Sequence, residues 1–160
     1  MSKKTWQEKL MNTKGLPKVE IISSKMASKW GTKAGDTLVI PAPIEVDAIM
    51  RKVPNGKLIT INEIRRALAK KHAATIACPI TTGIFARIAA GAAEEARIKG
   101  KNKEDITPYW RTLKAGGVIN EKYPGGVEVQ KKLLEQEGHR VIQKGKKYLV
   151  ADFEKYLVNL

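Results

Sequence analysis

The stretch TINEIRRALAKKHAATIACPITTGIFARIAAGAAEEARIK, residues 60–99, decides the fold. Thr60 is followed three residues later by Glu63, which is a capping-box signature, and apolar residues then repeat at helical spacing. After a connector, Thr81 or Thr82 can cap a second helix that ends near residue 99. Two helices joined in this way predict a variant of the helix-turn-helix motif, although the connector is longer than usual.

The two halves of this second helix differ in character. Small residues, among them Gly83, surround Arg87 in the first half, so its backbone can approach a phosphate or a groove wall. Glu94 and Glu95 make the second half repel DNA. We expect the first half, with Thr82, Gly83 and Arg87, to face nucleic acid. The alternative is that the small residues only permit close helix packing.

The segments before this helix pair predict further short elements. A helix at residues 4–12 and strands at 19–22 and 37–40 form a basic N-terminal extension, which we assign to residues 1–42. A helix that begins at Pro43 ends at the turn Pro54-Asn55-Gly56. The core domain is therefore expected to begin at residue 43.

The segments after the helix pair complete the predicted architecture. The core domain, residues 43–138, ends with a helix at 127–137, which a tight loop precedes. Residues 139–160 predict a β-hairpin with a basic tip and a short last helix, packed on that domain. The expected fold class is α+β and mostly helical: a winged helix-turn-helix-like DNA-binding domain with a short N-terminal extension and a C-terminal hairpin.

The charge of the chain points to a polyanionic partner. Lysine and arginine number 30 against 16 acidic residues, for a formal charge of +14, and basic residues occur along the whole sequence. Nucleic acid, either double-stranded DNA or RNA, is the first partner to expect from this charge. A merely soluble basic surface or attraction to anionic lipid would also fit the charge alone.

No stretch approaches the roughly 18 consecutive apolar residues of a membrane span, and Met1-Ser2-Lys3 does not lead into an apolar signal core. We therefore expect a cytoplasmic, monomeric protein without membrane contact, associated with the nucleoid if the source is prokaryotic.

The single cysteine, Cys78, excludes an internal disulfide and a zinc site of several thiolates. His72 and His139 are the only histidines, and their spacing supports no metal site, so no metal and no cofactor are expected. Cys78 lies just before a predicted helix, where the helix dipole would favour a thiolate nucleophile. The alternative is a small buried apolar residue.

Three separated segments, in the same order, resemble the DNA-binding domain of alkylguanine-DNA alkyltransferases. VPNGKLIT (53–60) is similar to the entry of that domain, PYWR (108–111) stands where the family has P-C-H-R, and YPGG (123–126), with the helix after it, resembles the Y-S-G-G loop and final helix. The resemblance covers roughly residues 44–138.

The resemblance implies that the family's chemistry is lost. Tyr109 stands in place of the alkyl-accepting cysteine and Trp110 in place of the histidine, whereas Glu137 and Arg111 match the family's glutamate and arginine. A phenol with a pKa of about 10 is neutral at pH 7, and tryptophan cannot act as a base. The chain thus resembles the alkyltransferase-like proteins, which lack the acceptor cysteine and are thought to mark damaged guanines for other repair enzymes. The implied function is non-enzymatic binding of damaged guanine in duplex DNA.

The resemblance also implies a lesion pocket. Tyr109 and Trp110 would offer flat faces on which an extruded base stacks, at about 1–3 kcal/mol per base, and Arg111 would hold a phosphate. Tyr123, Gly125 and Glu137 complete the expected pocket. The alternative is that both aromatic residues belong to the core.

The sequence departs from the family in the residues that flip the base. Ile61 replaces a tyrosine, and Gly83 or a neighbour stands at the intercalating arginine, with Arg87 one turn later. Binding in the minor groove through a helix of small residues would survive these changes.

Two other functions remain open at this point. One is a thiol enzyme that uses Cys78. The other is a ribosome-associated protein that binds RNA through its basic N-terminal arm and residues 144–147.

Overall fold

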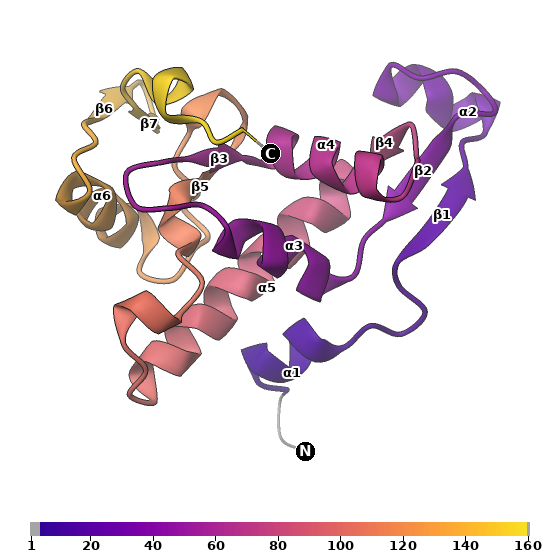
Figure 1. The fold of residues 1–160 in the computed structure, drawn as a ribbon. Helices are drawn as coiled ribbons and strands as arrows, with labels where there is room; N and C mark the ends of the chain where they lie inside the picture. Colours follow the sequence, from indigo (N-terminus) through magenta and orange to yellow (C-terminus); the bar gives the residue numbers. More distant parts are fainter. Residues whose placement is uncertain (1–3, 160) are drawn as a thin grey trace.

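Helix α5 (Pro79–Ile98) runs through the middle of the computed structural model, which describes residues 4–159 (Figure 1). Its buried face consists almost entirely of alanines and Gly91. These small side chains let α3 (Pro43–Arg51) and α1 (Trp6–Met11) pack directly on it. The close-packing alternative for the small residues therefore holds for this face of α5. The first three residues, which the sequence analysis assigns to the N-terminal extension, lie outside the described part.

Helix α4 (Ile61–Lys71) begins at the predicted capping box. The Thr60 N–H donates to Glu63 Oε1 at 2.8 Å, and Ile64 and Leu68 are fully buried on the inner face of the helix. The prediction of this helix is confirmed.

The start of α5 corrects a prediction. Neither Thr81 nor Thr82 is the cap: Cys78 occupies that position, and Pro79 opens the helix. Thr82 is fully buried, and its hydroxyl donates to the Cys78 carbonyl at 2.7 Å. Proline suits the first helical position because its φ is fixed and its missing N–H would have no helical partner there.

The connector between α4 and α5 contributes one strand to a three-stranded sheet. The short strand β4 (Ile76–Ala77) pairs in parallel with β2 (Thr37–Ile40), which in turn pairs antiparallel with β1 (Lys18–Ile21). Strands β1 and β2 correspond to the strands predicted at 19–22 and 37–40, whereas β4 was not predicted. The connector is long because it contains this strand.

Residues 18–40 form what we call the N-terminal module: β1, α2 (Ser24–Ala27), the 3₁₀ turn η1 (Ser28–Trp30) and β2. A small core of its own unites Ile22, Ala27 and Leu38 with Cys78. On the other face of the sheet, Val39 and Ala77 join the main core. The module is thus fixed between the main core and the start of α5.

The segment before residue 43 is built into the molecule. Leu10 and Val39 belong to the main core, and the Trp6 indole occupies the space that a Cβ at Gly91 would need. The predicted N-terminal extension is therefore no loose arm, because α1 packs on α5 and α3. The domain boundary at residue 43 stays a prediction.

The C-terminal third closes the other side of the core (Figure 1). Strand β3 (Ile59–Thr60) pairs in parallel with β5 (Thr112–Leu113), and α6 (Gly126–Gln136) follows the YPGG loop. The predicted hairpin is confirmed as β6 (Val141–Lys144) and β7 (Lys147–Val150), and the expected last helix is a 3₁₀ turn, η5 (Phe153–Tyr156). The α+β class is confirmed.

Within residues 4–159, no helix combines the length and apolar character needed to cross a membrane. The same residues contain no group of three or more His, Cys, Asp or Glu side chains arranged to hold a metal ion.

Candidate nucleic-acid interface

The N-terminal half of α5 presents an unusual exposed face. Ile80 is 60% exposed and Ile84 is 50% exposed, and the exposed Arg87 follows one turn later on the same side of the helix. A Cβ at Gly83 would meet open space. We call Ile80, Gly83, Ile84 and Arg87 the α5 stripe. Exposed large apolar residues beside an arginine are typical of helices that contact a partner.

The acidic residues in the C-terminal half of α5 have partners within the protein. Glu95 accepts hydrogen bonds from the backbone N–H groups of Trp6 and Gln7 at 3.1 and 3.3 Å, so it caps the start of α1. Glu94 pairs with Arg97. The acidic residues of this half of α5 thus have a structural role, because Glu95 holds α1 in place, in addition to their repulsion of DNA.

The structure places only part of the predicted set on this surface. Gly83 and Arg87 are accessible, whereas Thr82 is fully buried with its hydroxyl bonded inside the helix. Thr82 is therefore corrected from an interface residue to a structural one. Ile80 and Ile84 complete the stripe and were missed, although two isoleucines four residues apart before a basic residue were a readable signal.

The aromatic pair of the PYWR segment lies in the core. In the 3₁₀ turn η3 (Tyr109–Arg111), Tyr109 is 1% exposed and Trp110 is 2% exposed. The Tyr109 ring meets Trp110 and Tyr123 edge to face, with centroid distances of 5.4 and 5.7 Å. The expectation of an open stacking platform is corrected: the rings pack against one another, which leaves no free face on Tyr109.

The Tyr109 hydroxyl is a poor nucleophile in this environment. Burial raises the pKa of Tyr109 to about 12, with the negative charge of Glu94 adding to the effect and Arg97 opposing it. The phenol is therefore fully protonated at neutral pH.

Glu137 is the centre of a buried polar network. Its Oε2 accepts from Trp110 Nε1 at 2.9 Å and from Arg111 Nη2 at 2.7 Å, and its Oε1 accepts from Arg111 Nε at 2.8 Å. Burial opposes ionisation, but the hydrogen bonds from Arg111 and Trp110 outweigh it and hold the pKa of Glu137 below its ordinary value. Glu137 is thus a paired carboxylate and not a free base.

Arg111 is fully engaged in the same network. Its Nη1 donates to the Val53 carbonyl at 2.7 Å while Nε and Nη2 hold Glu137 in a bidentate pair. The expectation that Arg111 holds a phosphate is corrected, because these internal partners engage three of its nitrogens. Sequence reasoning placed Trp110, Arg111 and Glu137 in one site but missed that they bind one another.

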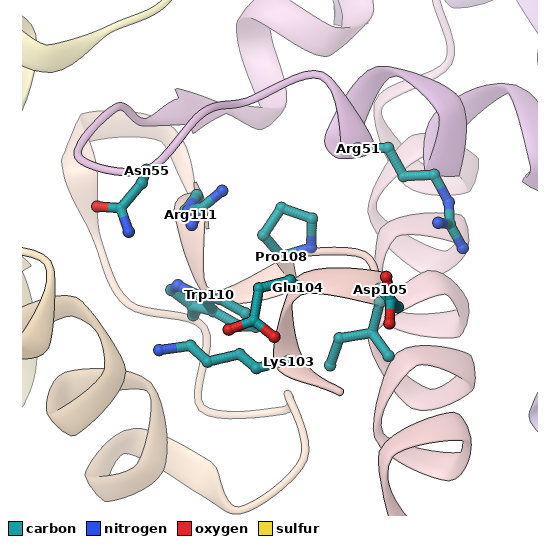
Figure 2. A pocket seen from close by; sticks show the side chains of 9 residues that line it. Arg51, Asn55, Lys103, Glu104, Asp105, Pro108, Trp110 and Arg111 are labelled. Atoms are coloured by element: carbon teal, nitrogen blue, oxygen red, sulfur yellow. The ribbon is translucent and has the colours of Figure 1, made fainter. Parts of the chain in front are cut away.

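A hollow of about 550 Å³ lies beside this network (Figure 2). Asn55 from the turn after α3 faces Lys103 and Glu104 of the 3₁₀ turn η2 (Lys103–Asp105) across it, and the edge of Trp110 forms part of its wall. Lys103 Nζ lies 5.2 Å from the centre of the Trp110 ring. No pattern in the sequence singled out Asn55 or Lys103 as lining residues.

The first and third residues of the YPGG loop, Tyr123 and Gly125, have structural roles. Tyr123 is buried, and burial raises the pKa of its hydroxyl. Gly125 has a φ of +82° as it opens α6, and a Cβ there would collide with Val129. The structure thus puts Tyr123 in the core and Gly125 at an exposed helix start.

Cys78 lies in the small core of the N-terminal module. Its thiol is buried among Ile22, Ala27 and Leu38. This is the environment of a packing residue, so the structure does not favour a nucleophilic role.

The stripe, the helix pair and the buried network together define a class: a basic α+β protein that presents the second helix of a pair on its surface.

No protein-family model matches the sequence, and no curated protein is significantly similar to it. Two crystal structures of the alkyltransferase-like protein Atl1 of S. pombe share its fold. One is a complex with damaged DNA containing O6-carboxymethylguanine, at a TM-score of 0.50 and 20% identity, and the other is a complex with DNA, at 0.51 and 19%. Each match covers 74% of this chain and 94% of the Atl1 chain. The chain therefore has the fold of an alkyltransferase-like protein.

Proposed function

We propose that this protein is a non-enzymatic binder of duplex DNA that recognises alkylated or otherwise damaged guanine. The observation that carries the proposal is the α5 stripe, which combines exposed isoleucines, a glycine and an arginine on one face. The shared fold with Atl1, which was crystallised with damaged DNA, supports the same assignment.

The stripe suits the minor groove. Proteins that bind there insert apolar side chains between base steps and place arginine in the groove. Ile80 and Ile84 would supply the apolar contact and Arg87 the cation, while Gly83 would let the backbone approach. In this arrangement α4 and α5 act as a helix-turn-helix with α5 as the inserted helix.

The chemistry of the buried network supports binding without alkyl transfer. Tyr109 is buried and protonated, and Glu137 is ion-paired with Arg111. Neither an activated nucleophile nor a free base stands at the positions where the resemblance would place them.

Preference for a damaged guanine requires a place for the altered base. The hollow beside Trp110 offers donors on Asn55 and Lys103, an acceptor on Glu104 and one edge of an aromatic ring (Figure 2). We assign it as the lesion-sensing region, with Trp110 as a wall of the hollow in place of a stacking platform.

Fluorescence anisotropy with matched duplexes, carrying either guanine or O6-alkylguanine at one position, tests the proposal. Binding should weaken as salt concentration rises, and the alkylated duplex should bind more tightly. Ile84→Glu should lower affinity about tenfold, because it places a carboxylate in the groove. Ile98→Glu is the matched control: Ile98 is exposed at the far end of the same helix, and its variant should bind like the unchanged protein.

Several outcomes would overturn the proposal. The first is that the protein binds neither duplex. The second is that Ile84→Glu and Ile98→Glu lose equal affinity for DNA. The third is that structured RNA outcompetes duplex DNA for the protein. Equal affinity for both duplexes would leave DNA binding in place and remove lesion recognition.

A further inference from the structure

A second cationic site lies between α4 and β4, outside the network and the stripe described above. It is a hollow of about 300 Å³ whose polar lining comes from Asn62, Arg65 and Arg66 of α4 and from Thr75 just before β4. We call it the Arg65 hollow. No acidic residue lines it.

Arg65 is held in place without a counter-ion. Its Nε donates to the Ala77 carbonyl at 2.9 Å, which fixes the guanidinium against the end of β4 and leaves its two terminal nitrogens available. Within residues 4–159, no carboxylate forms an ion pair with Arg65, whereas the neighbouring Arg66 pairs with Glu63 at 3.1 Å. Burial lowers the pKa of Arg65; the Cys78 side chain opposes this effect, and the charge of Arg66 adds to it. A partly buried cation in this state gains stability from an anion.

The other polar groups of the hollow suit a tetrahedral anion. The Asn62 amide offers N–H donors, and the exposed Thr75 accepts a hydrogen bond from the Thr37 N–H at 3.0 Å, which orients its hydroxyl group. Arginine with hydroxyl and amide donors is the usual set for contacts to phosphate oxygens.

The position of the hollow links it to α5. Strand β4 leads directly through Cys78 into Pro79, so the hollow lies immediately before the half of α5 that carries the stripe. Figure 1 shows β4 between α4 and the N-terminal module at the beginning of α5. The hollow and the stripe are therefore close along the chain, at the start of α5.

We propose that the Arg65 hollow binds a backbone phosphate of the duplex DNA that α5 enters. This inference rests on the proposed function and adds a contact that positions the duplex without reading its sequence. Arg65 supplies the charge, and Asn62 and Thr75 supply neutral donors.

Salt-dependent binding of Arg65→Gln to the same duplexes is the first test. The slope of log K against log salt should fall by about 1, and affinity should drop by the same factor on guanine and alkylguanine duplexes. Asn62→Ala should weaken binding while leaving the slope unchanged, because it removes a neutral donor. Arg140→Gln, at an exposed arginine in another part of the molecule, should change neither quantity.

A set of duplexes with single neutral methylphosphonates locates the phosphate. One position should weaken the unchanged protein several-fold and have no additional effect on Arg65→Gln, because both changes remove the same contact. Thermal unfolding of each variant without DNA separates a loss of contact from a loss of fold, since a damaged fold would weaken binding to every methylphosphonate duplex alike.

The outcomes separate this inference from the proposed function. If the unchanged protein binds no duplex, the proposed function fails. If it binds and Arg65→Gln keeps the same slope, or the methylphosphonate series shows no shared position, only the phosphate site is overturned. If inorganic phosphate raises the melting temperature of the unchanged protein while that series is flat, the hollow serves a free anion and the DNA assignment is wrong.

Discussion

Glu137 is the residue on which the polar interior depends most. It accepts three hydrogen bonds from Trp110 and Arg111, and both members of its ion pair are largely shielded from water. We expect Glu137→Gln to lower the free energy of unfolding by about 3 kcal/mol, because it leaves the Arg111 charge buried without a counter-ion. Urea unfolding measures the change.

An exposed pair provides the comparison for Glu137. Lys114 and Glu121 approach to 2.9 Å, but both side chains are about half exposed, so Glu121→Gln should reduce stability by less than about 1 kcal/mol. Equal losses in the two variants would show that the burial of the Glu137 pair has no energetic consequence.

His139 predicts a pH dependence of stability. The ring is buried against Tyr156 at a centroid distance of 4.8 Å, and burial lowers the pKa of His139 below its ordinary value, with Glu137 opposing. Because the unfolded chain binds the proton more readily, stability is complete above pH 6.5 and falls as pH drops through the lowered value. Thermal unfolding between neutral pH and about pH 5 should show this loss, and His139→Phe should remove it.

The carboxylates define a separate window. The lowered pKa values of Glu45 and Glu137 mean that their stabilisation is lost only as pH falls below about 4.5. A melting temperature of the unchanged protein that stays constant down to this range would contradict the assignment to His139.

At the scale of elements, the contact between α1 and α5 depends on one missing side chain. The Trp6 indole fills the place of a Cβ at Gly91, so Gly91→Ala should displace α1 and lower stability by about 1–3 kcal/mol despite the higher helix propensity of alanine. Calorimetry of Gly91→Ala, Trp6→Ala and the double variant measures this, and the two changes should be non-additive. Gly83→Ala is the control: open space surrounds that position, so the variant should be slightly more stable.

Most helices and strands could be predicted from the sequence because short-range patterns in the chain specify them. The capping box at Thr60 and Glu63 predicts α4, and alternating apolar residues around a basic turn predict the hairpin β6–β7. These signals act within a few residues of the chain, so no knowledge of distant contacts is needed.

The features that could not be predicted depend on distant pairing. Strand β4 has two residues and exists because β2, some forty positions earlier, lies beside it. Likewise, the Tyr109 ring packs edge to face against Tyr123, which lies 14 positions later in the chain and which no local pattern could place against it. The family resemblance correctly predicted that the residues of the network lie in one site, but it could not show that Arg111 and Glu137 bind each other.

At the scale of the whole molecule, exposed lysines lie on the N-terminal module. Lys25, Lys29 and Lys33 are exposed on the N-terminal module, and none forms an ion pair with the described carboxylates. The module's core includes Cys78, the residue that caps α5, so these lysines lie near the proposed interface. Replacing all three by glutamine should lower the salt slope of DNA binding by up to about 3.

The hairpin supplies a matched triple for this comparison. Lys144, Lys146 and Lys147 are equally exposed, but the hairpin and the module lie at opposite ends of the molecule in Figure 1. Their replacement should leave the slope unchanged. A larger effect from the hairpin triple would place the duplex at the other end of the protein.

The pairing of β4 with β2 also has a thermodynamic consequence for recognition. A connector without structure would let α4 and α5 reorient, and binding would then have to restrict that motion. Here the sheet holds the connector before any partner arrives, so the helix pair is already in its binding geometry. Isothermal titration calorimetry should therefore show a smaller entropic penalty for this protein than for Cys78→Pro. That variant lacks the N–H that donates to the Val39 carbonyl of β2 at 2.9 Å, and it leaves the proposed DNA contacts in place.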